Sequence, residues 1–214
     1  MFETTMSKTS MIKTTSLKTA GFKKTVFASA IAAAALVPFS QAQAADYQID
    51  IEGQHAFVQF KINHLGFSYI LGSFEEFDGQ FSYDADDLDA SSAEIEVQIA
   101  SLNSNHAERD RHILSEDFLN ASEYPTATFT STGFESTGDG EGVLTGDLTL
   151  HGETQEIEMP VTLMGEGDDP WGNYRAGFEG STMLTLGDYG IDMSAFPEAM
   201  HDLELYVTFE GIRQ

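Results

Sequence analysis

Apolar and polar residues alternate along most of this chain from residue 56 onward. In the stretch AFVQFKINHLG, residues 56–66, the apolar Val58, Phe60 and Ile62 alternate with polar residues, and His64 takes the next position on the apolar face. Successive side chains of an extended strand point to opposite faces, so this period predicts a β-strand with one buried face. Seven further segments show the same period, namely 74–83, 93–101, 127–132, 142–150, 155–165, 175–186 and 202–211.

These eight segments predict an all-β domain. Turns rich in Gly, Asp and Asn join them, and none is the continuous apolar run that is typical of parallel strands, so the sheet should be antiparallel. A sandwich and a closed barrel both fit this pattern. Glycines interrupt the apolar rows at Gly79, Gly146 and Gly180. They indicate curvature and favour a barrel with a lumen, although the apolar rows could equally be packed core.

One segment, residues 103–125, lacks the alternation and is rich in helix formers. Asn103 or Ser104 could cap a helix that runs through about Leu114. A single helical insertion in an all-β chain usually covers an opening, so we expect this helix at one end of the barrel.

The first 44 residues have the composition of a secretory signal. Five lysines precede residue 25, an apolar run spans 26–37, and Ala42-Gln43-Ala44 offers an A-x-A cleavage site. The run is short for a stable membrane span, which makes an uncleaved anchor the weaker alternative. We expect residues 1–44 to be a signal peptide that sends residues 45–214 to the periplasm, with translation starting at Met1, Met6 or Met11.

The predicted mature domain is strongly acidic. The whole chain has 35 acidic residues, 10 Lys and Arg, and a formal charge of −25; residues 1–44 contain one acid and five lysines, so 45–214 carries −29. Such a surface repels nucleic acid and anionic headgroups, so we expect no nucleic-acid partner. There is no cysteine, and hence no disulfide can form. No D-x-D-x-D-G calcium loop occurs, so a solvated acidic surface is favoured over a calcium site.

The sequence contains no recognisable catalytic or metal-binding motif. Four histidines could be imagined as metal ligands, namely His55, His64, His112 and His151, but they lack ligand spacing. Arg109 and Asp110 beside His112 could suggest acid–base chemistry, although such charges more often dock a helix through hydrogen bonds. A nucleophile elbow, a P-loop and a dinucleotide fingerprint are absent from the sequence. We therefore expect no metal and no catalytic residue.

Four blocks of this chain resemble the signature segments of the YceI family, namely 47–79, 108–132, 144–154 and 187–192. The resemblance covers nearly all of 46–214, in order and at matching spacing. It implies an extended, eight-stranded, antiparallel, lipocalin-like barrel with a short helical insertion. It also implies an apolar pore that holds a polyisoprenoid or a similar long-chain, fatty amphiphile.

The chain departs from the family pattern at one place. Members often carry an Arg in the strand before the D-F/Y-G-I block, where this chain reads MLTLGDYGI at 183–191. A positive contact to an anionic head group is then missing, which favours a neutral or quinone-like head. Apart from such a bound lipid, no cofactor is expected.

Two functions remain open: a periplasmic carrier or sequestering protein for such a lipid, and a hydrolase or isomerase that acts on it within the barrel. The predicted pore lining is Val58, Phe60, Ile62, His64, Phe77, Phe81, Ile95, Val97, Ile99, Phe129, Leu148, Leu150, Met159, Val161, Phe178, Leu205 and Val207. His64 could contact the lipid head or bond a backbone carbonyl in its own turn. A homodimer that pairs along a strand edge is also open.

We predict that the mature protein starts at about Ala45 and leaves the cell with the periplasmic fraction on osmotic shock. Mass spectrometry of the purified protein measures its N-terminus. A protein that stays with the membrane and still starts at Met1, Met6 or Met11 would contradict the cleavage.

Overall fold

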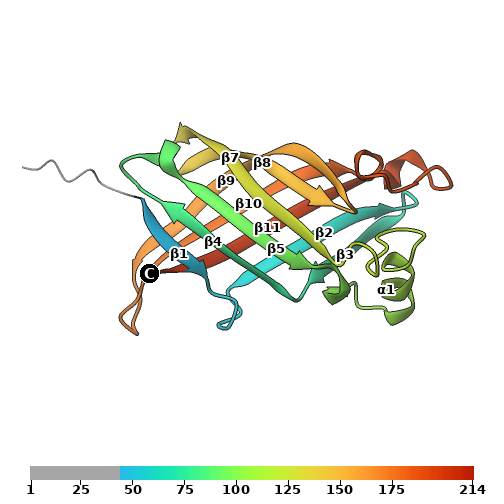
Figure 1. Cartoon of the computed structure of the whole chain (residues 1–214), viewed down its shortest axis with the longest axis horizontal. Coiled ribbons are helices and arrows are strands. Elements are labelled where there is room, and N and C mark those ends of the chain that lie inside the picture. Colours follow the sequence, from blue (N-terminus) through green and yellow to red (C-terminus); the bar gives the residue numbers. More distant parts are fainter. Residues whose placement is uncertain (1–43) are drawn as a thin grey trace, which may run out of the picture. The chain divides into compact units, whose positions relative to one another are not determined.

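The computed structural model describes residues 44–214, so the predicted signal peptide lies outside the described residues except for Ala44. The strands are β1 (Ala45–Ile49), β2 (Ala56–His64), β3 (Ser68–Phe74), β4 (Phe77–Tyr83), β5 (Ser92–Gln98), β6 (Leu102–Asn103), β7 (Thr126–Gly138), β8 (Glu141–Leu150), β9 (Glu153–Asp168), β10 (Tyr174–Thr185) and β11 (Asp202–Arg213). The helix α1 spans Ala107–Ile113 (Figure 1). Short 3-10 turns are η1 (Leu88–Ala90), η2 (Ile99–Ser101), η3 (Leu186–Tyr189) and η4 (Glu198–Met200). No helix in this part of the chain has the length and apolar character that crossing a membrane requires.

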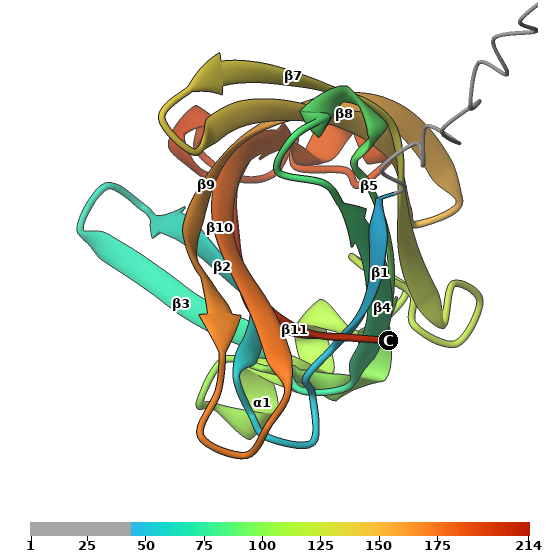
Figure 2. The same ribbon diagram turned by 90° about the vertical axis from the view of Figure 1, so that its left-hand side faces the viewer.

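The sheet closes on itself through β1. This strand pairs antiparallel with β4 on one side and with β11 on the other, where Tyr47 lies opposite Arg213 and Ile49 opposite Gly211. The ring is therefore β1, β4, β5, β7, β8, β9, β10 and β11 (Figure 2). The predicted eight-stranded antiparallel barrel is confirmed.

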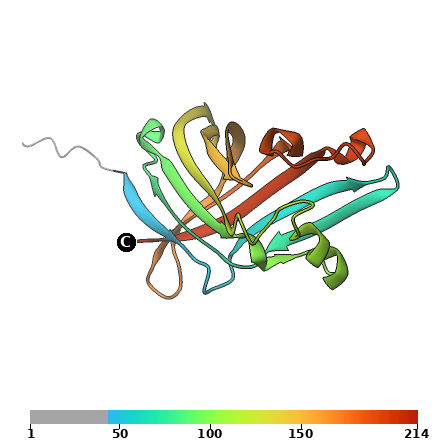
Figure 3. The ribbon, with the colours of Figure 1, turned by 45° about the vertical axis from the view of Figure 1, so that its right-hand side comes forward.

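The β2–β3 hairpin extends the barrel wall beyond this ring. Strand β11 pairs with β1 near its C-terminal end and with β2 through Leu203–Phe209, so β1 and β2 follow one another along the same edge of β11. The hairpin leans away from the ring (Figure 3). Its tip lies at the same end of the barrel as α1 and the segment 186–201 (Figure 1), and we call this end the helix end.

Three strands were missed by the sequence pattern, namely β1, β3 and β6. The strand β3, SYILGSF, places Tyr69, Ile70 and Leu71 in succession, so apolar residues occupy both of its faces and hide the period of two. The expected helix from Asn103 or Ser104 to Leu114 was too long. Asn103 belongs to β6, and α1 begins after His106, whose ring accepts a hydrogen bond from the Arg109 amide (3.3 Å).

Glycines in the inward rows are overlaid by neighbouring side chains. A Cβ at Gly146 would lie 2.5 Å from the Phe129 ring, and one at Gly180 would lie 2.9 Å from the carbonyl of Pro160. The absence of a side chain thus lets the strands bend and lets aromatic rings cross from strand to strand. The expected curvature is present, and the space at these glycines is filled by their neighbours.

A single cation ties three segments together at the end opposite α1. Arg175 on β10 contacts Asp50 (2.6 Å), Asp169 (2.7 Å) and Glu210 (3.1 Å), which come from the β1–β2 loop, the β9–β10 turn and β11. The Arg175 side chain is only 17% exposed. Hydrogen bonds from its guanidinium hold the pKa values of Asp50 and Asp169 below the usual range for a carboxyl group.

We predict that Arg175→Met lowers the melting temperature at pH 7, because three carboxylates are left together without their cation. The folded pKa of both aspartates is depressed, so their contribution is full above the unfolded carboxyl pKa of about 3.9 and fades as the pH falls below it. The difference in melting temperature between wild type and variant should therefore shrink below about pH 4.

Arg111→Met is the matched control, because Arg111 pairs with Glu108 on the exposed face of α1. It removes the same charge with little effect on melting. An equal loss of stability in both variants would show that net charge, and not the cluster, is responsible.

Candidate functional site

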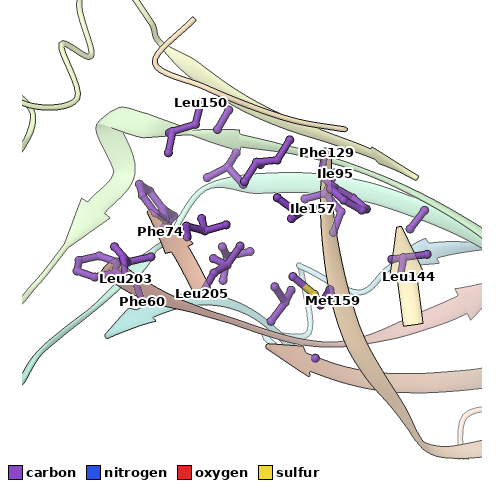
Figure 4. Close-up of a pocket in the computed structure, with 18 of the residues that line it drawn as sticks. Phe60, Phe74, Ile95, Phe129, Leu144, Leu150, Ile157, Met159, Leu203 and Leu205 are labelled. Carbon is purple, nitrogen blue, oxygen red and sulfur yellow. The ribbon is translucent and has the colours of Figure 1, made fainter. Parts of the chain in front are cut away.

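The barrel encloses an apolar cavity of about 590 Å³. This volume lies within the range of about 300–1,000 Å³ that is usual for small-molecule pockets. Side chains from opposite walls point into it, as Figure 4 shows for Phe60, Ile95, Phe129 and Leu205. The cavity can therefore accommodate an elongated apolar molecule along the barrel.

Strand alternation produces this lining. On β11, Leu203, Leu205, Val207 and Phe209 line the cavity. Between them lies Glu204, which faces outward and accepts a hydrogen bond from Lys61 on β2 (2.6 Å). Because neighbouring strands repeat this arrangement, one face of the closed sheet is largely apolar and the other carries most of the acidic residues.

Nearly all of the predicted lining residues face the cavity. They are Val58, Phe60, Ile62, His64, Phe81, Ile95, Val97, Ile99, Phe129, Leu148, Leu150, Met159, Val161, Phe178, Leu205 and Val207. Phe77 does not line it. It lies at the start of β4 opposite Val97 and packs among the neighbouring core side chains. Contact of these residues with a ligand stays a prediction.

Sequence reasoning missed the side chains that cover the helix end. Phe118 follows α1, and Phe196 belongs to the segment 186–201; both line the cavity, and their rings are 5.7 Å apart. Met193 packs in the same cluster. In the segment after α1 and in the segment 186–201, apolar and polar residues do not alternate. The signal in the sequence was therefore limited to single apolar residues between polar neighbours.

Polar groups border the cavity at its helix end. His64, Arg109 and His112 all line it there. Arg109 donates to the Ser104 hydroxyl (2.7 Å) and to the Ser104 carbonyl, while Asp110 accepts from the Ser104 amide (2.9 Å). The charged hydrogen bonds expected of Arg109 and Asp110 are thus present and dock α1 on the buried Ser104. Within residues 44–214, no carboxylate forms an ion pair with Arg109.

His64 is exposed at the end of β2. Of the two alternatives for its side chain, the hydrogen bond to a carbonyl in the turn is not formed within the described residues, and the His64 carbonyl itself accepts from the Phe67 amide (2.9 Å). Because the hairpin turn satisfies its own backbone, the ring is left at the cavity mouth.

The other histidines lie in separate places. His55 contacts Asp50 (3.3 Å), His112 lies 3.7 Å from Asp117, and His151 is 2.9 Å from the Tyr189 carbonyl. Across residues 44–214, the structure brings together no group of three or more side chains that could hold a metal ion.

Tyr189 is buried where β9 and β10 separate. Their pairing stops at Gly180 and Val161, and beyond it the Thr182 hydroxyl bridges the gap by donating to the Glu158 carbonyl (2.8 Å). The Tyr189 hydroxyl has no hydrogen-bond partner in the described part of the chain, and burial raises its pKa to about 12. The phenol therefore stays neutral at physiological pH.

Known proteins share this sequence and this architecture. A family model described as a YceI-like domain matches residues 47–211. UPF0312 proteins of Azotobacter vinelandii and Ectopseudomonas mendocina are 53% and 54% identical over 180 and 174 residues, which cover 84% and 81% of this chain and 93% and 91% of theirs.

Solved structures agree with the fold. Burkholderia cenocepacia BcnA superposes with a TM-score of 0.67 at 19% identity, covering 76% of this chain and 98% of its own. A polyisoprenoid-binding domain from Saccharophagus degradans, implicated in plant cell wall breakdown, superposes with a TM-score of 0.61 at 13% identity, covering 80% and 100%.

We predict that Leu205→Trp removes binding capacity without removing stability. Leu205 is half-buried on the inner face of β11 and borders the cavity, so an indole can fill open space. In a packed core the same change would cost about 1–3 kcal/mol through overpacking. Thermal melting and titration with the apolar dye N-phenyl-1-naphthylamine, on delipidated protein, measure both quantities.

Thr208→Trp is the control, because Thr208 alternates with the lining residues and faces outward on the same strand. It should leave dye binding unchanged. A large fall in melting temperature for Leu205→Trp with no dye binding by wild type would mean that the interior is filled core.

Proposed function

The chain belongs to the YceI family, and we propose that it is a periplasmic carrier or sequestering protein for a polyisoprenoid or a similar long-chain amphiphile. The family match over 47–211 confirms the resemblance seen in the sequence. The observation that carries the proposal is the enclosed apolar cavity of about 590 Å³.

In this proposal, hydrophobic burial supplies the affinity for the hydrocarbon tail of the ligand. Each methylene moved from water into an apolar site contributes about 0.8 kcal/mol. The long strands surround the cavity with aliphatic and aromatic side chains, among them Phe60, Phe129 and Leu205 (Figure 4). A carrier needs this continuous contact and few directional bonds, because the methylene units of its ligand are alike.

The polar head would lie at the helix end. Arg109, His64 and His112 border the cavity there, and each can donate a hydrogen bond to an oxygen. The strand before GDYGID supplies no arginine, and the acidic surface repels anions. We favour a neutral, oxygen-bearing head such as a quinone over a pyrophosphate, because Arg109 is the single Lys or Arg among the described residues that line the cavity.

The similarity to the Saccharophagus degradans domain supports the same class of ligand by analogy of fold. Catalysis on such a lipid is the weaker alternative. Within residues 44–214, the serines that line the cavity form no hydrogen bond with a histidine, and the Ser91 hydroxyl has no partner. An activated nucleophile needs such a base within reach.

The decisive test is extraction of the protein with organic solvent after its purification from the periplasm. We expect mass spectrometry to find a near-stoichiometric long-chain amphiphile in wild type and little in Leu205→Trp. A lipid-free wild type from cells that make prenyl lipids would refute the carrier function. Conversion of added prenyl lipid into a product, rather than its recovery unchanged, would favour the enzyme.

A further inference from the structure

The tip of the β2–β3 hairpin carries exposed apolar side chains. Phe67 is 87% exposed, Leu71 64%, Tyr69 59% and Leu65 44%. We call these four residues the tip patch. The other large exposed apolar residues of the described chain are spread out, with Phe57 near the start of β2 and Met164, Trp171 and Met183 on other strands and turns. The patch is therefore a local concentration that folding alone does not require.

The same hairpin is free of acidic residues. Residues 53–74 contain no Asp or Glu, although 34 acids occur between residues 45 and 214, and the next longest acid-free stretches are 97–107 and 124–134. The cation Lys61 lies 4.7 Å from the centre of the Tyr69 ring and pairs with Glu204. The tip patch thus lies in the longest stretch of the domain that contains no acidic residue.

The turn holds its apolar residues outward. Leu65 and Gly66 both have positive φ, +56° and +80°. The Gly66 amide donates to the Asn63 side chain (2.6 Å) and the Phe67 amide to the His64 carbonyl (2.9 Å). The turn needs no outside partner for these amides. A leucine is disfavoured in this conformation, where asparagine is preferred, so local folding does not explain its presence.

The inner face of the hairpin is a wall of the cavity. Phe60 and Ile62 on β2 and Ile70 on β3 line it, while Tyr69 and Leu71 point to the other face of the same strands. The hairpin projects at the helix end (Figure 3). The two faces meet at the turn, where His64, which lines the cavity, directly precedes Leu65 of the tip patch.

We propose that the tip patch docks on the surface of a zwitterionic lipid bilayer, so that the amphiphile passes between membrane and cavity along this hairpin. The proposal rests on the proposed carrier function. An aromatic and aliphatic tip of this kind enters the boundary between headgroups and acyl chains. Anionic lipid would be repelled by the domain, whereas a zwitterionic surface carries no net charge.

A second copy of the chain is the competing occupant. Residues 68–72 of β3 have no strand partner on their outer edge within the described chain, which would permit edge-to-edge pairing. Such pairing would bring two domains of formal charge −29 together. This repulsion opposes a dimer and does not oppose a neutral bilayer.

The test is flotation of the purified full domain with phosphatidylcholine vesicles. Leu65→Asn combined with Phe67→Asn should lower the bound fraction about tenfold, because the patch loses its apolar area. Its melting temperature should stay equal or rise, since asparagine suits the left-handed position. Trp171→Asn, at a residue 78% exposed in the β9–β10 turn, is the matched control and should change binding less than twofold.

Wild type that fails to float, or a double variant that floats as well as wild type, would overturn the proposal. A dimer in light scattering that the double variant dissociates, without vesicle binding, would overturn it in favour of self-association. Extraction of the same samples separates the two proposals. Lipid-loaded protein that does not bind vesicles refutes docking alone, and lipid-free protein that binds them refutes the carrier function alone.

Discussion

The structure depends on the closure of one antiparallel sheet. β11 is long enough to pair with β1 and with β2 in succession, so it joins the first strands of the domain to the last. Without this pairing the apolar face of the sheet would be open to water, because the described chain has a single short α-helix to cover it. When the sheet closes, each inward side chain has a neighbouring strand on both sides. The interior of the barrel is then a space that the backbone does not cross.

Charge and hydrophobicity are separated across this wall. The inward positions hold aliphatic and aromatic residues, and the outward positions carry most of the acids. Arg175 counteracts the resulting repulsion where the β1–β2 loop, the β9–β10 turn and β11 meet, and it does so while largely buried. The helix end is built differently, from apolar side chains such as Phe118 and Phe196 and from the hydrogen bonds of Arg109.

The two ends of the domain are therefore stabilised in different ways. The Arg175 cluster fixes strand ends that must stay paired if the ring is to remain closed. The helix end combines non-strand segments, polar groups at the cavity and a projecting hairpin. Such segments can move with a smaller loss of backbone hydrogen bonds than the strands of the ring. An opening to the cavity is therefore easier to form at the helix end than between paired strands.

The sequence by itself determined the strands whose two faces differ. Val58, Phe60 and Ile62 alternate with polar residues, and this alternation identified β2 and most of the cavity lining because one face of a strand must be buried. Only the tertiary structure revealed β3, whose Tyr69, Ile70 and Leu71 are apolar on both faces, and the contact of Phe118 with Phe196. The period of a strand is a local property of the chain. Closure, the cavity and its cover depend on pairing between segments far apart in sequence, which alternation does not encode.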